Sequence, residues 1–293
     1  MKIKNNSVTI NLPSPELKLS EFYSEKPFII FYNDNFIEPD IYDHFILKMK
    51  YLFNDQKWSE DATGKKRFKF DVNRRKIKGL DEMISDFVGI FGTKEFKGWF
   101  KQTHECFYNK GIFGSVFPKY KIEKLILKII NKISRKIFKL KAFNVYTAQV
   151  EFSKLPSGAS LVPHTDSYTK RMALVFYTPF TKTTREMTKK WGTTFWKAKT
   201  GQMPIRSWLS NHQLNNQELK NFFNKNEVLK SIDYKSNRVN GFIKNDLSWH
   251  SVEKNTLNED RVAVVINIHD IASTEDDIPM IESIQSKLIN KSS

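Results

Sequence analysis

The spacing of apolar residues changes near Asn144, and this change is the strongest constraint on the fold. Before it, "KYKIEKLILKIINKISRKIFKLK" (Lys119 to Lys141) repeats Ile and Leu at the period of an amphipathic helix. After it, short segments such as "FNVYTAQVEFSKL", "MALVFYT" and "RVAVVINIHD" are rich in β-forming residues and are separated by turn residues. Helices followed by short strands predict an α+β domain with supporting helices first. We expect its strands to form an antiparallel sandwich or barrel of the jelly-roll kind.

The amphipathic segment from Lys119 to Lys141 has two interpretations. Ile122, Ile129, Ile133 and Ile137 share one face, and lysines cover the other. We expect the apolar face to support the sheet while the lysines stay in water. The alternative is a helix that lies on an anionic membrane surface.

The chain of 293 residues is long enough to bury a large core and reads as one domain with elaborations. We expect a loose lead-in at residues 1–25, a single domain at 26–275 and a C-terminal tail at 276–293. A polar, partly helical stretch at about 198–236 separates two groups of strand-like segments. We predict that it is an insertion and that it shapes the entrance to the site together with the loop at 58–78.

The cysteine count bears on the compartment. Cys106 is the single cysteine, which excludes an internal disulfide framework and fits a reducing, cytoplasmic environment. The N-terminal residues show no signal-peptide pattern. The chain has no uninterrupted run of about 18 apolar residues, so we expect no transmembrane helix.

The net charge of +16 arises from 48 basic and 32 acidic residues. Such a balance is found in proteins that bind nucleic acid, anionic membranes or acidic substrates. Here the lysines are spread along most of the chain, and the accompanying richness in Asn, Ile and Phe indicates a compositional bias. We therefore do not assign a partner from the charge alone.

The stretch "LVPHTDSYTKRMALVFYT" places His164 and Asp166 one residue apart, just before an apolar run. On a strand these two side chains would project from the same face. His250, in "NDLSWHSVEK", follows one strand pattern and precedes another. If the sheet closes on itself, the three residues form a two-histidine, one-carboxylate set, which suits non-haem Fe(II) and O₂ chemistry.

Arg261 opens the apolar strand "RVAVVINI", eleven residues after His250. A guanidinium entering an apolar strand is costly to bury without an anionic partner. Its planar fork suits a carboxylate held through two hydrogen bonds. The alternative is an ordinary ion pair with Asp246 or Glu259.

From about Phe28 to Asp270 the chain resembles the Fe(II)/2-oxoglutarate-dependent oxygenase superfamily, in the style of its prolyl-hydroxylase-like branch. The matching segments are "HTD", "RMALVFYT", "KKWGTTFW", "NGFIKNDLSWHSV" and Arg261 with its strand. "FIIFYNDNFIEPDIYDHF" also resembles the usual entry segment of the family. HxD alone is weak evidence, whereas the combination of these segments is specific.

The resemblance implies a double-stranded β-helix (jelly-roll) core in which His164, Asp166 and His250 hold Fe(II). It also implies that 2-oxoglutarate binds the iron through its C1 carboxylate and keto oxygen and pairs with Arg261 through its C5 carboxylate. O₂ would then oxidise a substrate C–H bond while 2-oxoglutarate becomes succinate. With Asp166 present, hydroxylation or another oxidative outcome is expected in place of the halogenation carried out by relatives that lack this carboxylate.

The sequence departs from the family pattern at a position that helps to bind the 2-oxoglutarate cosubstrate in relatives. Many prolyl-hydroxylase-like members have a tyrosine upstream of HxD, where this chain has Phe152. The residues that stand in for it are open among Gln149, Tyr146, Tyr177 and Thr178. Demethylases of alkylated nucleobases carry a second arginine six residues after the first, and here that position is Asn267.

The substrate is predicted to be a small metabolite or an amino-acid or sugar precursor. Arg171 is a candidate to hold an anionic group, with an outward-facing position as the alternative, and Trp249 is a candidate substrate contact. Two other interpretations stay open: a basic jelly-roll module that binds nucleic acid or a membrane, and an oxygenase that acts on a polyanionic substrate. A metal-bound, non-oxidative cupin-like protein is a further class, against which Arg261 argues.

Overall fold

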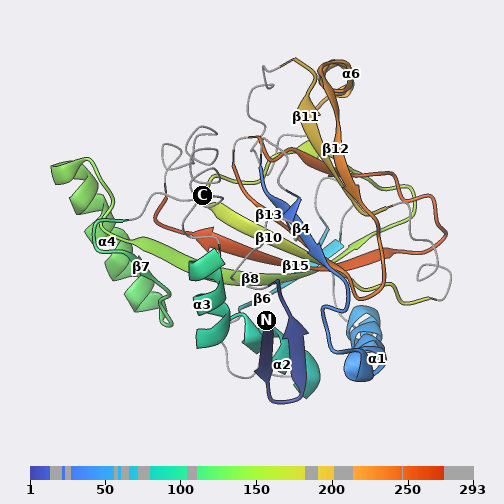
Figure 1. The fold of residues 1–293 in the computed structure, drawn as a ribbon, viewed down its shortest axis with the longest axis horizontal. Helices are drawn as coiled ribbons and strands as arrows, with labels where there is room; N and C mark the ends of the chain where they lie inside the picture. Colours follow the sequence, from blue (N-terminus) through green and yellow to red (C-terminus); the bar gives the residue numbers. More distant parts are fainter. Residues whose placement is uncertain are drawn as a thin grey trace.

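The computed structural model of the chain (Figure 1) describes residues 1–13, 22–23, 28–55, 59–60, 66–71, 80–103, 111–181, 191–200, 214–245 and 247–273. Within these residues the protein has an α+β fold with two principal antiparallel sheets. The predicted C-terminal tail and most of the 58–78 loop lie outside the described residues. No helix in the described part of the chain combines the length and apolarity needed to cross a bilayer.

Among the described residues, the major sheet contains nine strands. Its path runs β3 (Phe22–Tyr23), β4 (Ile30–Asn33), β13 (Val239–Ile243), β10 (Lys170–Tyr177), β15 (Arg261–Asp270), β8 (Asn144–Leu155), β6 (Lys66–Asp71) and β5 (Ser59–Glu60). The ninth strand, β7 (Ser115–Val116), lies parallel to β8, while the other pairs are antiparallel. Neighbours in this sheet come from distant parts of the sequence, as the pairing of β8 with β15 illustrates.

The minor sheet has the order β12 (Asn226–Ile232), β11 (Thr193–Ala198), β14 (His250–Val252) and β9 (Leu161–His164). The stretch expected to be an insertion at 198–236 therefore includes β12, a strand of this sheet. Helix α6 (Asn216–Lys225) leads into it and begins with a capping box between Asn215 and Glu218. Residues 201–213 lie outside the described part.

The first residues differ from the loose lead-in that we expected. Strands β1 (Lys2–Asn5) and β2 (Val8–Asn11) pair as a hairpin. Asn6 turns the chain with a φ of 46°, a conformation that asparagine tolerates better than most residues. Ile3, Val8 and Ile10 are buried in the core, and this burial orders the segment.

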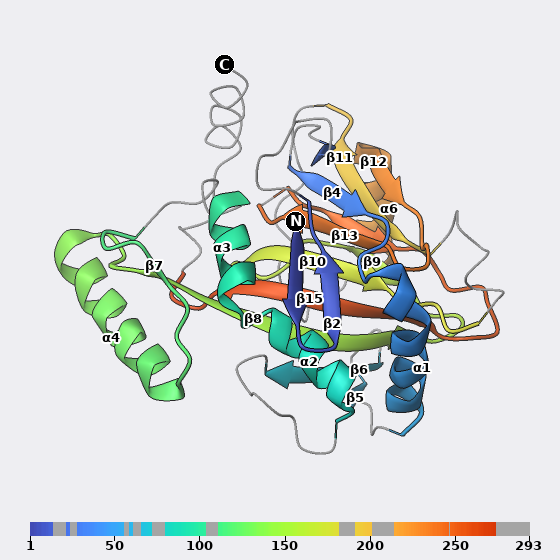
Figure 2. The same ribbon diagram turned by 60° about the horizontal axis from the view of Figure 1, so that its bottom comes forward.

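Three helices cover one face of the major sheet: α1 (Pro39–Asp55), α2 (Glu82–Ile90) and α3 (Lys94–Thr103). Figure 2 shows them on the side opposite the minor sheet. Pro39 begins α1, where the missing N–H of proline removes no helical hydrogen bond. The helices and the sheet share a large apolar core that includes many phenylalanines.

Strand β15 separates two environments, because successive side chains point to opposite faces. Val262, Val264, Ile266 and Ile268 join the core under the helices; we call this side the helix-side face. Ala263 belongs to a second apolar cluster, together with residues of β11 and β12. This second side, which faces the minor sheet, is called the inner face.

Helix α4 (Lys121–Phe138) departs from the prediction. Its apolar face does not support the sheet: Ile129, Ile133 and Ile137 are 50%, 53% and 62% exposed. The side chains that it buries are the polar Asn131 and Ser134. The expectation was wrong because periodicity fixes which residues share a face of a helix, but not which face meets the protein.

Candidate metal centre

Two histidines and one aspartate meet where β9 and β14 pair. His164 ends β9, His250 begins β14, and the antiparallel pairing places their Cα atoms opposite each other. Asp166 lies two residues beyond the end of β9, so it reaches the site from the loop that follows the strand and not from the strand position that we expected. One ligand atom from each residue lies within 4.8 Å of the other two.

Backbone carbonyls orient both imidazole rings. His164 Nδ1 lies 2.8 Å from the Val162 carbonyl oxygen, and His250 Nδ1 lies 2.9 Å from that of Ser248. Because a carbonyl oxygen only accepts, we assign the ring proton to Nδ1 in each case, which makes Nε2 the unprotonated ring nitrogen. Such a backbone contact is the usual support of a metal-binding histidine.

Lys170 binds one oxygen of Asp166 and leaves the other available. Lys170 Nζ lies 2.7 Å from Asp166 Oδ1. Asp166 Oδ2 is buried, has no hydrogen-bond partner among the described residues and lies 3.6 Å from His250 Nε2. A buried carboxylate oxygen without a donor is unfavourable. Asp166 Oδ2 is therefore the carboxylate atom suited to bind a metal ion.

The electrostatics keep Asp166 and His250 in a metal-binding protonation state. Burial would raise the pKa of Asp166, but Lys170 and the two histidines outweigh burial and hold this pKa below its ordinary value. Burial, followed by the influence of His164, lowers the pKa of His250 to about 3. At neutral pH the site therefore presents a carboxylate and a neutral imidazole at His250, which are the forms that coordinate metals.

Two phenylalanines form a wall beside His250. The ring centroid of Phe242, on β13, lies 4.7 Å from that of His250, and the centroid of Phe195, on β11, lies 6.2 Å from it. Both rings belong to the apolar cluster of the inner face. Apolar rings next to ligand side chains keep bulk water from that side of the site.

Arg261 lies at the start of β15 and is 5% exposed. Its Nε donates to the carbonyl oxygen of Trp191, while its Nη2 is buried without a hydrogen-bond partner among the described residues. Glu259, one proposed ion-pair partner, accepts from Thr181 Oγ1 at 2.8 Å. Asp246, the other, lies outside the described residues.

The turn before β11 explains how a backbone oxygen reaches Arg261. Trp191 has a φ of 59°, an unfavourable value for a bulky residue. At Gly192 a Cβ atom would lie 1.6 Å from the carbonyl oxygen of Ile232, so only glycine fits. The close approach of the chain to Ile232, where the antiparallel pairing of β11 and β12 begins, thus requires the glycine of "KKWGTTFW".

Two tyrosines flank the Arg261 guanidinium. Its central carbon lies 5.3 Å from the ring centroid of Tyr177 and 5.2 Å from that of Tyr234. The Tyr177 hydroxyl lies 2.8 Å from Thr193 Oγ1 and accepts from Asn240 Nδ2 at 2.7 Å. The rings hold the guanidinium by cation–π contact and leave its terminal nitrogen unpaired.

The residues considered for binding 2-oxoglutarate lie on two different faces of the major sheet. Tyr177 contacts Arg261, as described above. Gln149 lies on β8 opposite Asn267 of β15, on the inner face. Thr178 directly follows β10 and is buried, and its hydroxyl has no partner among the described residues. Tyr146 and Phe152 lie instead in the helix-side core, away from Arg261.

Arg171 is neither at the outer surface nor beside the three candidate ligands. It occupies a bulge in β10, where the register with β15 shifts, and a bulge redirects a side chain. Its guanidinium donates to the Tyr168 carbonyl oxygen at 3.0 Å and to Ser273 Oγ, and it lies 3.7 Å from Asp270. These contacts hold the Arg171 side chain against the residues at the end of β15 and just after it.

Trp249 precedes His250 and points to the opposite side of the minor sheet. Its ring centroid lies 4.9 Å from that of Phe222 on α6. Trp196 packs in the same place, 5.7 Å from Phe222. Both tryptophans pack under α6 and away from the histidine rings.

Two residues of the site were not predicted from the sequence. Lys170 follows Asp166 by four residues, a spacing that identifies a partner only once the turn between them is known. Tyr234 lies in the stretch taken for an insertion, so nothing in its local sequence indicated a contact with Arg261.

Neither the family models nor the curated proteins gave a match to this sequence. The solved structures that match this one include a Pseudomonas putida prolyl-4-hydroxylase, which is 8% identical with a TM-score of 0.47, over 82% of this chain and 91% of that chain. A 2OG-Fe(II) oxygenase family oxidoreductase from Burkholderia pseudomallei is 9% identical, with a TM-score of 0.39 and coverages of 80% and 82%.

A third similar structure is the epimerase SnoN in complex with Fe³⁺, α-ketoglutarate and nogalamycin RO. It is 9% identical with a TM-score of 0.38, over 82% of this chain and 78% of its own. With identities of 9% or less and TM-scores below 0.5, these matches transfer no fold, function or site residue to this chain.

Proposed function

We propose that this protein is an Fe(II)- and 2-oxoglutarate-dependent dioxygenase that hydroxylates a C–H bond of a small molecule. We further propose that its two sheets form the double-stranded β-helix expected from the sequence. The observation that carries the proposal is the convergence of His164, Asp166 and His250, whose ligand atoms lie within 4.8 Å of one another.

The donor set fits a ferrous ion. Two imidazoles and one carboxylate suit Fe(II) and leave coordination positions open for other ligands. Asp166 Oδ2 has no partner among the described residues, while Lys170 holds Oδ1. Binding of a cation would satisfy that buried oxygen.

Arg261 fits the distal carboxylate of 2-oxoglutarate. Its Nη2 is the unpaired end of a buried cation, and Trp191, Tyr177 and Tyr234 hold the rest of the side chain. A carboxylate would supply the missing acceptor and balance the charge. We propose that Gln149, Tyr177 and Thr178 contribute to this pocket.

Bound iron and 2-oxoglutarate would supply the activation of O₂ and the oxidation of the substrate. The chain's own residues do the positioning. Val162 and Ser248 orient the two imidazoles, and Lys170 restrains the carboxylate. Phe195 and Phe242 shield His250 from water and provide an apolar wall for a substrate. We propose a small metabolite or an amino-acid or sugar precursor as substrate, acted on in the cytoplasm.

The alternative of a basic module that only binds nucleic acid does not explain these features. Nucleic-acid binding requires neither a buried carboxylate oxygen without a donor nor a buried guanidinium nitrogen without an acceptor. An oxygenase that acts on a polyanionic substrate uses the same metal centre and differs only in what enters the site.

The test is the visible spectrum of the metal-free protein after anaerobic addition of Fe(II) and then 2-oxoglutarate. We expect a weak charge-transfer band that requires both additions. It should disappear in His164→Ala and His250→Ala. In Arg261→Met the 2-oxoglutarate concentration needed for half of the band should rise by about 100-fold or more, because a buried charge-assisted contact is lost.

Two control variants separate site effects from general effects. His44→Ala removes an exposed histidine of α1, and Arg238→Met removes a guanidinium that is paired with Asp34. Both should keep the band. Iron binding without any band on addition of 2-oxoglutarate would refute the oxygenase assignment at the cosubstrate.

A further inference from the structure

Helix α4 presents an apolar surface that no described part of the protein covers. In Figure 2 it lies at one end of the molecule, apart from the helices that pack on the major sheet. Its outward side chains are more than one third exposed: Ile122, Leu125, Ile126, Ile129, Ile130, Ile133 and Ile137. We call this set the α4 apolar face. Contiguous exposed apolar residues on this scale mark contact surfaces.

Polar contacts determine the rotation of α4 and therefore the direction of this face. Asn131 Oδ1 accepts from the Phe143 backbone N–H at 2.9 Å, and Ser134 Oγ donates to the Leu140 carbonyl oxygen at 2.8 Å. Arg135 Nη2 donates to the carbonyl oxygen of Ala272 at 3.2 Å. Turning the helix to bury its isoleucines would break these hydrogen bonds, so its outward orientation is specified.

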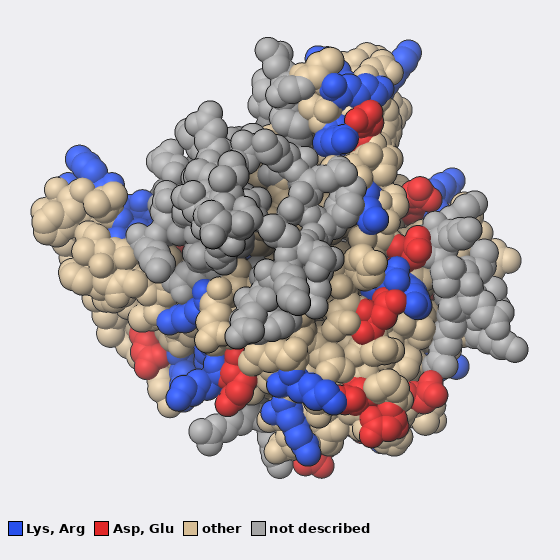
Figure 3. All heavy atoms as spheres, viewed as in Figure 1, with Lys and Arg blue, Asp and Glu red and all other residues tan. Residues whose placement is uncertain are grey.

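A basic stripe borders the apolar face. Lys121, Lys128, Lys132 and Lys136 recur at intervals of seven and four residues, so they lie on one side of the helix, and all are exposed. Glu123 is the single acidic residue of α4, and its carboxylate accepts from backbone N–H groups at the helix start. In Figure 3 the end of the molecule where α4 lies is mostly uncharged surface, with blue Lys and Arg and some red Asp or Glu at its edges.

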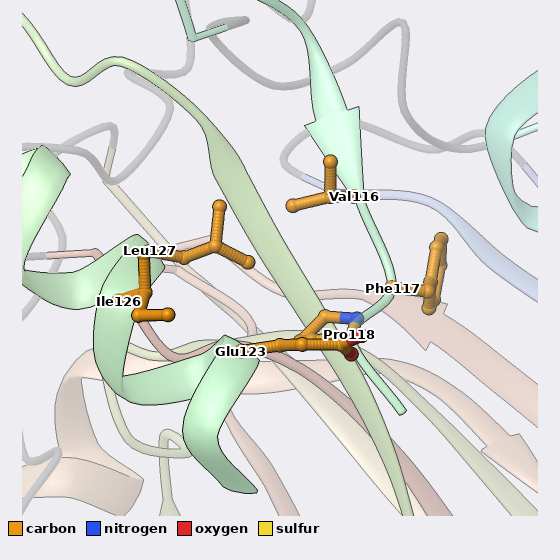
Figure 4. Close-up of a pocket in the computed structure, with 6 residues that line it drawn as sticks. All are labelled: Val116, Phe117, Pro118, Glu123, Ile126 and Leu127. Carbon is orange, nitrogen blue, oxygen red and sulfur yellow. The ribbon is translucent and has the colours of Figure 1, made fainter. Parts of the chain in front are cut away.

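An apolar pocket extends this surface between α4 and β7. It has a volume of about 450 Å³ and is lined by Val116, Phe117, Pro118, Glu123, Ile126 and Leu127 (Figure 4). Ile126 belongs both to the pocket and to the α4 apolar face. The exposed apolar surface is therefore recessed at this point.

We propose that α4 docks the protein onto an anionic lipid surface, with its apolar face in the acyl region and its lysines against the headgroups. An amphipathic helix with Leu and Ile on one side and lysines beside them has the composition of an interfacial helix. The lysines match the negative charge of such a surface. A second copy of the chain fits less well, because it would bring two basic stripes together with one glutamate per helix to offset them.

The test is sedimentation of the full-length chain with vesicles of phosphatidylcholine alone and with vesicles in which about one third of the lipid is phosphatidylglycerol. We expect binding to the anionic vesicles, weak binding to the neutral ones, and loss of most binding at about 0.5 M salt. Equal binding to both vesicle types, or none to either, would overturn the proposal.

Paired variants assign the binding to α4. Ile129→Glu with Ile133→Glu should lower the partition coefficient about 100-fold, because two apolar contacts become charged. Lys128→Gln with Lys132→Gln should lower it about 20-fold on anionic vesicles. Leu47→Glu, at a residue of α1 that is 46% exposed, is the matched control and should bind like the unchanged protein.

Circular dichroism and the melting temperature check that each variant is folded, which is expected because the substituted side chains are exposed. If the Ile129→Glu, Ile133→Glu protein binds vesicles as well as the unchanged chain, the docking surface is not α4. If the unchanged chain is a dimer that these substitutions dissociate, and no vesicle binding occurs, the occupant is a second copy. Either result refutes the lipid proposal, and neither depends on the proposed oxygenase function.

Discussion

The two faces of the major sheet use the same strands for different purposes. On the helix-side face, β15 contributes Val262, Val264, Ile266 and Ile268 to an apolar core. On the inner face, the same strand begins with Arg261 and carries Asn267, both with buried polar atoms that lack partners among the described residues. One face therefore stabilises the fold, and the other accepts an energetic cost that a ligand would offset.

A second contrast concerns buried charges. Asp270 Oδ2 accepts from Lys141 Nζ at 2.9 Å and from Ser273 Oγ at 2.8 Å, while Oδ1 accepts from the Val145 N–H at 2.9 Å. Arg261, buried to a similar degree, keeps an unpaired terminal nitrogen. A buried carboxylate whose two oxygens both accept hydrogen bonds supports the structure, whereas the buried donor of Arg261 without an acceptor is the feature on which we base the proposed carboxylate site.

The largest expected effect on stability is on the helix-side face. Phe176 is fully buried, and its ring centroid lies 4.9 Å from that of Phe36 and 6.0 Å from that of Phe87. Phe176→Ala should lower the free energy of unfolding by about 4 kcal/mol, measured by urea denaturation. Val175→Ala, at the next residue on the inner face, should cost about 1 kcal/mol. Equal losses would show that the two faces do not differ in this way.

The next effect tests the paired against the unpaired charge. Asp270→Asn should cost about 3 kcal/mol, because Lys141 and Arg171 would stay buried without their anion. Arg261→Met should leave the free energy of unfolding unchanged within about 1 kcal/mol or raise it, because a buried cation is replaced by an apolar side chain. A large loss in Arg261→Met would mean that Arg261 is a structural residue.

Asp270 also predicts a pH dependence of stability. Burial would raise its pKa, but Lys141 and then Arg171 outweigh burial and lower the pKa below the ordinary value of 3.8. The unfolded chain therefore binds a proton at this residue before the folded chain does. The stabilisation is complete well above pH 3.8 and is lost as the pH falls below it. Asp270→Asn should flatten this part of the acid denaturation curve.

The smallest effect compares two tyrosines on opposite faces. The Tyr177 hydroxyl accepts from Asn240 at 2.7 Å, and the Tyr146 hydroxyl accepts from Asn144 at 3.1 Å. Tyr177→Phe and Tyr146→Phe should each cost about 1 kcal/mol of stability. Only Tyr177→Phe should weaken 2-oxoglutarate binding, by several-fold, in a titration of the visible band. Equal weakening by both would place the cosubstrate elsewhere.

The candidate ligands could be predicted from the sequence because metal sites need particular residue types at restricted spacings. His164, Asp166 and His250 were selected in this way, and the structure brings them together. The partners around them could not be predicted. Tyr234 reaches Arg261 only because β12 joins the minor sheet. Arg171 lies beside Asp270 because β10 has a bulge at this residue. No residue pattern in β10 predicts that bulge.

The sequence by itself determined the α+β class, the amphipathic character of α4 and the three candidate ligands, because periodicity and side-chain chemistry are local properties. The tertiary structure alone decided that α4 turns its isoleucines outward and that Arg261 keeps an unpaired nitrogen. Asn131 and Ser134 bond to the backbone of Phe143 and Leu140, which follow the helix. Arg261 bonds to the carbonyl oxygen of a residue 70 positions earlier in the chain. Such contacts depend on where the folded chain places its backbone, which local residue patterns do not specify.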